Sequence, residues 1–339
     1  FEGTISTSTS PASFRNLTIK HSDDSNDFNA ILSFSFINDS LNLLASDIKL
    51  TSTNAKVFLD NFLSTPLLPN LFSARTEINI ERAEISPTTG LDILALNNIN
   101  LNLGDGNITG NIKYPLLNNQ PLFAELKLEK IGIFDISSYL RSYLSEVRPL
   151  NFDITGDNLT LGTTNIKNLF LKGYYANSEL ALNSFSFDSD DNTSINLTGN
   201  KKFNSTDFDL KFKLRTNNAL SLKDIFSDFL DDLKNLPEKY LTSCKDFSGN
   251  ISKKGHSLNL TKITYNENAE NISGQIELTP DNFLLDISAN NFDFDKYFEA
   301  KFLVIPNVSE VNFLKRFLAS LGVFKNTQAK IAIDAKDFV

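Results

Sequence analysis

The sequence predicts a mainly β protein with short α-helices. We expect an elongated, curved antiparallel β-sheet, a groove-like repeat array in which amphipathic helices follow the repeat units. Apolar and polar residues alternate with a period of two in many short segments, which is typical of strands with one covered face. A unit made of a glycine-led strand, a polar turn, a second alternating strand and a helix recurs at 110–144, 199–233 and 274–298.

The first copy shows the unit most clearly. Leu126 and Leu128 alternate with charged residues, so this strand covers something on one side only. The apolar positions of 136–147 have helical spacing, with Asp135 as N-cap and Pro149 as stop. The copy therefore predicts two strands followed by an amphipathic helix.

The other copies repeat this order with different residues. Strand alternation covers 208–214 in the second copy and 283–289 in the third, and the helices are predicted over 222–233 and 296–300. One more amphipathic helix is predicted over 311–321. The segment 28–63, with strands over 28–36 and 41–50 and a helix over 55–63, is interpreted as a degenerate first copy.

Further strands are predicted between the copies. Asp105-Gly106 lies between two alternating segments and predicts a hairpin whose two central residues both have positive φ. Short strands are predicted at Leu159–Leu161, Ile166–Leu171, Leu180–Leu182, Phe185–Phe187 and Ile195–Leu197.

The chain is divided by this pattern into a polar lead-in, 1–27, and a continuous β-repeat array, 28–339. The lead-in holds a first strand around Phe14–Ile19. The predicted units of the array are 28–97, 98–150, 151–240, 241–325 and the start of a further unit at 326–339. Because the sequence contains no Met and begins with Phe, we expect a fragment of a longer protein.

Composition excludes several classes of protein. A net charge of -9 argues against nucleic acid as a partner, because phosphate contacts need clustered Lys and Arg. No run of 18 apolar residues is present, so any membrane anchor lies outside this segment. The single cysteine, Cys244, excludes a disulfide within the chain.

No catalytic, cofactor or metal site is predicted. The stretch Asp188–Asn192 has Asp, Asp and Asn at the first, third and fifth places of a calcium loop, but Thr193 and Gly199 stand where Gly and Glu are needed. A solvated hairpin turn is the favoured interpretation. His21 and His256 are far from Cys244 in sequence, and no nucleophile, phosphate-loop or dinucleotide motif occurs. We therefore expect a non-enzymatic protein.

The repeated unit resembles that of the AsmA-like envelope proteins of Gram-negative bacteria, the AsmA/TamB/YhdP type. The resemblance is carried by ISGQIELTPDNFLLDISANNFDFDKYF, by the similar strand-to-helix steps KLEKIGIFDISSYL and KLRTNNALSLKDIFSDFL, and by the preceding NLTLGTTNIKNLFLKGYYANSELALNSFSF. It implies a periplasmic protein, anchored to the inner membrane in its full-length form. It also implies a role in outer membrane biogenesis through lipid transport along a hydrophobic groove.

Two functions follow as hypotheses. The first is a lipid-binding or phospholipid-transfer segment whose apolar strand faces line the groove, with phospholipid or another acyl-chain lipid as partner. The second is a structural or protein-interaction scaffold of the envelope that carries no lipid and binds envelope proteins. Periodicity alone does not separate an open trough from a face covered by helices or a second sheet. The candidate lining residues are Leu126, Leu128, Leu210, Phe212, Leu214, Leu285 and Ile287.

Overall fold

All the regular secondary structure that is described consists of β-strands. The structure is a computed structural model that describes residues 2–6, 13–37, 40–53, 76–88, 91–115, 120–132, 149–161, 164–190, 192–217, 245–267, 270–279, 282–291 and 328–336. The prediction of a mainly β fold is confirmed. The five predicted helices, at 55–63, 136–147, 222–233, 296–300 and 311–321, lie outside the described residues. Among the residues that the structure describes there is no helix, and hence none that could cross a membrane.

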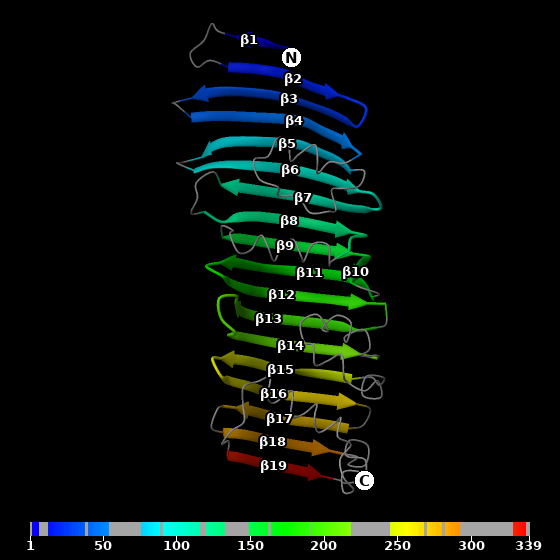
Figure 1. Ribbon diagram of the computed structural model, residues 1–339, viewed down its shortest axis with the longest axis vertical. Coiled ribbons are helices and arrows are strands. Elements are labelled where there is room, and N and C mark those ends of the chain that lie inside the picture. The colour runs from blue at the N-terminus through cyan, green and yellow to red at the C-terminus, as the bar shows by residue number, and fades with distance from the viewer. Residues whose placement is uncertain are drawn as a thin grey trace. The chain divides into compact units, whose positions relative to one another are not determined.

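The chain forms two compact units, of which the first consists of Phe1–Leu161 and Asn168–Asn177. From β1 to β8 each strand pairs antiparallel with the next strand in sequence (Figure 1). β8 and β9 are parallel, and β9 pairs antiparallel with β11. The strands are β1 (Glu2–Ser6), β2 (Ser13–Ser22), β3 (Asn26–Ile37), β4 (Ser40–Ser52), β5 (Thr76–Thr88), β6 (Leu91–Leu103), β7 (Gly106–Pro115), β8 (Leu122–Glu129), β9 (Leu150–Asp157), β10 (Leu159–Leu161) and β11 (Thr164–Ala176), most of which belongs to this unit.

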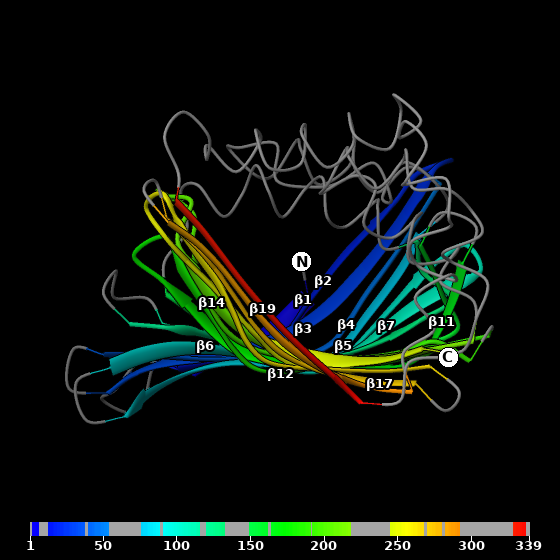
Figure 2. The same cartoon turned by 90° about the horizontal axis from the view of Figure 1, so that it is seen from below.

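The second unit consists of Gly162–Lys167 and Ser178–Val339. Its strands also pair in chain order, antiparallel from β12 to β18 and parallel between β18 and β19. Both units are open sheets whose strands bend and twist along their length (Figure 2). The strands of the second unit are β12 (Glu179–Ser189), β13 (Ser194–Lys202), β14 (Phe208–Thr216), β15 (Lys245–Lys254), β16 (Ser257–Glu267), β17 (Glu270–Leu278), β18 (Asn282–Asn290) and β19 (Gln328–Lys336).

Alternation along each strand gives each sheet one apolar and one polar face. In β14, Leu210, Phe212 and Leu214 are partly buried, whereas the intervening Lys211 and Lys213 are exposed. Because side chains of directly paired residues lie on the same face, the register carries this separation from strand to strand. Leu210, for example, lies between Gly199 of β13 and Ile251 of β15.

β-Bulges keep the apolar residues on one face where the sequence alternation breaks. In β6 the alternation jumps from Leu96 to Ile99, and the pairing with β7 shifts register at the same place. Asn98 has a φ of 53° and takes up the extra residue. Asn16 and Asp47 have φ values of 54° and 51° next to similar shifts in β2 and β4. Asn and Asp tolerate this conformation better than other residues with side chains.

One strand prediction is corrected by such a register shift. The sequence predicts two short strands at Leu180–Leu182 and Phe185–Phe187, but both belong to the single strand β12. Its pairing with β13 shifts between Leu182 and Phe185, so the two-residue interruption is accommodated within the strand.

Three glycines stand at equivalent places in the repeated hairpins. Gly110 in β7, Gly199 in β13 and Gly274 in β17 each face the next strand so closely that a Cβ atom would lie 2.0, 2.0 and 2.2 Å from a backbone carbonyl oxygen. Gly110 and Gly199 also have φ values of +149° and +134°. Only glycine satisfies these positions. The repeat of two alternating strands is therefore confirmed in β7–β8, β13–β14 and β17–β18, but each glycine lies inside the first strand, whereas the sequence predicts that it begins the strand.

The predicted hairpin at Asp105-Gly106 is present, but its turn lies one residue earlier. Leu103 pairs with Gly106, so Gly104 and Asp105 are the two loop residues. Gly104 has a φ of 65°, while Asp105 is not among the described residues with positive φ. Glycine at the first central position is typical of a type II′ turn, which replaces the expected turn with two positive φ values.

Candidate functional site: the apolar sheet faces

In the first unit the two predicted lining residues lie on the apolar face of β8. Leu126 pairs with Gly110 of β7 and Ile154 of β9, and it is partly buried. Leu128 is 7% exposed and is therefore part of the core. Leu126 has a glycine beside it, and this leaves its side chain with less lateral cover than a larger neighbour would provide.

In the second unit the other five lie on one apolar face. Leu210, Phe212 and Leu214 are on β14 and Leu285 and Ile287 on β18, and all are partly buried. The ring of Phe212 lies against Gly249 of β15, and its centroid is 4.9 Å from that of Phe247. These side chains form a continuous apolar strip, because β15, β16 and β17 between them also present apolar residues in register.

Sequence reasoning missed a deeply buried part of this face. Leu258 and Leu278 are 8% and 2% exposed and pack with four partly buried residues, Phe208, Ile251, Leu260 and Phe283. Phe247 and Tyr265 extend the strip, with ring centroids 6.4 Å apart. Leu258 and Leu260 show the same alternation as the predicted lining, and this signal could have identified them.

In each unit, the apolar face ends at buried hydroxyl groups that lie at one end of the strands. In the second unit, Thr193 and Thr216 are fully buried, and their Oγ1 atoms are 2.7 Å apart. Thr193 precedes Ile195 by two residues and Thr216 follows Leu214 by two, so both lie on the apolar face. In the first unit, Ser52 pairs with Thr76, and its hydroxyl donates to Asn26 Oδ1 at 2.6 Å.

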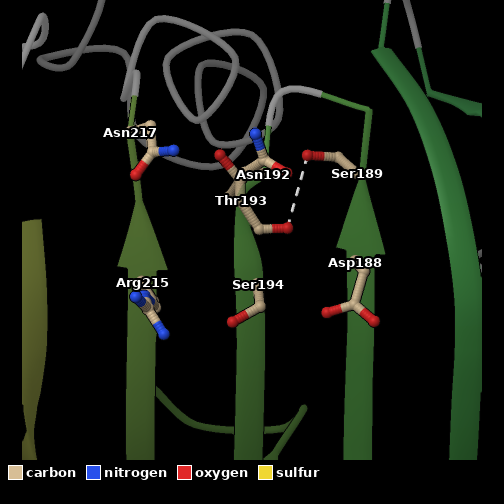
Figure 3. A pocket seen from close by; sticks show the side chains of 7 residues that line it. All are labelled: Asp188, Ser189, Asn192, Thr193, Ser194, Arg215 and Asn217. Carbon is tan, nitrogen blue, oxygen red and sulfur yellow. Dashed lines mark hydrogen bonds between the residues drawn. The ribbon is translucent and has the colours of Figure 1, made fainter. Parts of the chain in front are cut away.

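A polar pocket lies beside these strand ends in the second unit. It is lined by side chains from the ends of β12, β13 and β14 and from the turn between β12 and β13 (Figure 3). The guanidinium of Arg215 makes no hydrogen bond or ion pair with the residues that the structure describes. The lining residues are Asp188, Ser189, Asn192, Thr193, Ser194, Arg215 and Asn217.

The stretch Asp188–Asn192 lies at the connection of a β-hairpin, as predicted. Asp188 pairs with Ser194, and the backbone nitrogen of Ser189 donates to the carbonyl of Thr193 at 2.8 Å. The carboxylate of Asp190 forms an ion pair with Lys167 and accepts a hydrogen bond from Asn165. These contacts, that with Lys167 first, hold the pKa of Asp190 below its ordinary value.

No metal centre is found in the part of the chain that the structure describes. There, no three His, Cys, Asp or Glu residues group in a way that could hold an ion. His21 lies 2.9 Å from Asp23 through Nε2. Cys244 lies outside the described residues. The pKa of Asp23 is lowered chiefly by the backbone N–H of Ser25, which indicates a hydrogen-bonded turn.

Comparison with known proteins yields no relative. The chain matches no family model, no curated protein and no solved structure.

Proposed function

We propose that the chain is a non-enzymatic lipid-binding or phospholipid-transfer segment that holds acyl chains on the apolar faces of its sheets. The observation that carries this proposal is the continuous apolar face of the second unit from β12 to β18. Its side chains on β14 are only partly buried, whereas Leu278 is 2% exposed. A face of this kind offers acyl chains a surface without a polar barrier.

The energetics are sufficient for binding without specific polar contacts. Each methylene group moved from water to an apolar surface contributes about 0.8 kcal/mol, so a dozen would contribute on the order of 10 kcal/mol before the costs of association. Aromatic side chains such as Phe212 and Phe247 widen the apolar surface.

The resemblance to AsmA-like proteins supports the same proposal and extends it to the cell. We propose that the chain acts in the periplasm in outer membrane biogenesis, with its hydrophobic groove formed by the strand faces. In the full-length protein an anchor outside this segment would hold it at the inner membrane. Envelope proteins are proposed as further partners.

The replacement of Phe212 by Asp tests the lining. We expect co-purifying phospholipid, measured by mass spectrometry, to fall at least about tenfold, because the carboxylate would lie in the middle of the apolar strip. Lys213→Asp is the matched control, since it introduces the same charge on the polar face of the same strand. It should leave the lipid content unchanged.

A milder variant keeps this test decisive if Phe212→Asp fails to fold. Phe212→Ala removes the ring without burying a charge and should still lower the lipid content, with circular dichroism reporting the retained sheet. Unchanged lipid content in the folded variant, or no lipid in the folded wild-type protein, would contradict the proposal. The second result would favour the scaffold hypothesis.

A further inference from the structure

The apolar face of the second unit carries two lysines at the strand ends opposite to its buried hydroxyl groups. Lys201 of β13 and Lys253 of β15 both pair with Phe208 of β14, so the three residues lie on the same face. On its other side Lys253 pairs with Leu258, which is 8% exposed and belongs to the core of this face. Both lysines are partly buried. A lysine in such a place covers apolar surface with its stem and keeps its ammonium group at the polar margin.

The ammonium group of Lys201 is satisfied within the protein. Its Nζ donates to the backbone carbonyl oxygens of Lys202 and Ser205 at 2.7 and 2.8 Å, in the turn between β13 and β14. The carbonyl oxygen of Asp207 lies 3.4 Å from the same atom. Because an ammonium group has three donors, Lys201 has none left for a ligand.

Another lysine of the same face, Lys245, lies at the other end of β15. It pairs with the fully buried Thr216. This end of the face also carries the carboxylate of Glu267, which is 3% exposed and accepts a hydrogen bond from Tyr265. Lys245 and Glu267 both take part in further interactions of the protein. The positive charge of Lys245 is therefore accompanied by a negative charge on the same face.

Lys253 differs from both of these lysines. Its ammonium group makes no hydrogen bond or ion pair with the residues that the structure describes. Its direct neighbours on the two adjacent strands are Phe208 and Leu258, which carry no charge. Asp207, in the adjoining turn, accepts a hydrogen bond through Oδ1 from the backbone nitrogen of Gly255 at 2.8 Å. Lys253 thus places an unmatched positive charge at the end of the apolar surface.

The apolar surface that begins at Lys253 is long enough for an acyl chain. From Lys253 to Phe247, β15 spans roughly 20 Å, and one leaflet of a bilayer gives an acyl chain roughly 15 Å. The ammonium group and this surface lie on the same side of the sheet. An amphiphile whose chains lie on the surface would therefore bring its headgroup to the lysine.

We propose that Lys253 binds the phosphate of an anionic phospholipid whose acyl chains extend along this face towards Phe247. An ammonium group is a compact positive charge with three donors, which suits the oxygens of a phosphate. A zwitterionic headgroup would bring a positive charge of its own to the lysine, so an anionic headgroup is preferred. The inference deepens the proposed lipid function, on which it rests for the acyl chains.

Titration calorimetry on the full chain with three defined probes tests the assignment. The probes are dihexanoylphosphatidylglycerol, which is anionic, dihexanoylphosphatidylcholine, which is zwitterionic, and sn-glycerol 3-phosphate, which offers the phosphate chemistry without acyl chains. We expect the anionic lipid to bind about tenfold more tightly than the zwitterionic lipid. Glycerol phosphate should bind more weakly than the anionic lipid, because it gains nothing from the apolar face.

Substitutions of two neighbouring lysines separate a placed headgroup from a general attraction to positive charge. Lys253→Gln should weaken the anionic lipid about tenfold and so abolish the preference, whereas Lys253→Arg should retain it. Lys254→Gln is the matched control, since it removes the same charge one residue away, on the opposite face of the strand. It should retain the preference, with circular dichroism reporting the sheet in every variant.

The outcomes distinguish the headgroup assignment from the proposed function. If both lipids bind but wild type shows no preference, or Lys253→Gln retains the preference, or Lys254→Gln loses it equally, the lipid function stands and the headgroup assignment is overturned. If wild type binds neither lipid, the proposed function fails. Glycerol phosphate that binds wild type and not Lys253→Gln would then show a site for a free phosphate ester. Phe212→Asp should weaken both lipids alike, which tests the apolar face separately.

Discussion

At the scale of single residues, glycine decides how closely paired strands approach. A Cβ atom on Gly199 would lie 2.0 Å from the carbonyl oxygen of Asp209, which is far inside van der Waals contact. The obstructing atom belongs to the backbone, so relief requires the two strands to separate. Gly255, at a hairpin turn, has a φ of +56° but open space around its missing side chain.

The substitution Gly199→Ala should therefore destabilise the protein by more than about 3 kcal/mol, since it adds a backbone clash to the unfavourable φ. Gly255→Ala, which meets only the conformational cost, should lose about 1–2 kcal/mol. Urea unfolding followed by far-UV circular dichroism compares the two variants. Equal losses would show that the close strand approach at Gly199 relaxes freely.

At the scale of the strand, bulges determine which residues share a face. Asn98 accepts a φ of 53°, and its side chain donates to Glu81 while its backbone nitrogen donates to Asn111 Oδ1 at 3.0 Å. The conformation is local, and its effect extends along the strand. Without the bulge, the residues on one side of Asn98 would turn to the opposite face.

Replacing Asn98 by Val and by Gly isolates the backbone requirement of this bulge. Both variants lose the side-chain hydrogen bond to Glu81, but only Val opposes the positive φ. We expect Asn98→Val to be less stable than Asn98→Gly by about 1–2 kcal/mol in thermal or urea unfolding. Equal stability of the two variants would mean that the strand pairs without the bulge in solution.

The strands were predictable from sequence where the alternation is uninterrupted. Leu210 to Leu214 and Leu285 to Ile287 were placed on the right element because the residues between them, Lys211, Lys213 and Asp286, are charged. Alternation failed at Leu182–Phe185, where a register shift joins two segments that periodicity separates. A bulge changes the phase by one residue, and only the pairing with the next strand reveals whether the chain continues or turns.

The candidate sites were predictable to different degrees. The apolar lining follows from periodicity, although Leu128 is more deeply buried than a lining residue needs to be. The pocket around Arg215 was not predicted, because its residues come from three strands and a turn and share no spacing. Asp188 and Asn192 were noticed only as a failed calcium loop. Register across strands, which the sequence does not state, brings Asp188, Ser194 and Arg215 into one row.

At the scale of the whole molecule, each sheet is held together by pairing between neighbouring strands. Most strands pair with the strands before and after them in the chain, within each of two compact units. Stability in such an arrangement approximates a sum of nearest-neighbour terms, as in repeat proteins. A local defect should therefore have a local effect.

Hydrogen exchange on Gly199→Ala tests this locality. We expect backbone amides of β13, β14 and their neighbours in the second unit to lose protection, while β3–β6 in the first unit retain it. Mass spectrometry of peptides after deuterium labelling measures both regions in one sample, with Gly255→Ala as the matched variant. A uniform loss across both units would show that the chain unfolds as a single cooperative body.

Pairing in chain order also bears on how such a chain is made and how it changes length. A hairpin can form as soon as its two strands have left the ribosome, because it waits for no distant partner, and low contact order favours rapid folding. The insertion or loss of a complete hairpin keeps strand direction and facing unchanged on either side. The amount of apolar surface can therefore be altered by duplication in evolution without redesign of the rest of the sheet.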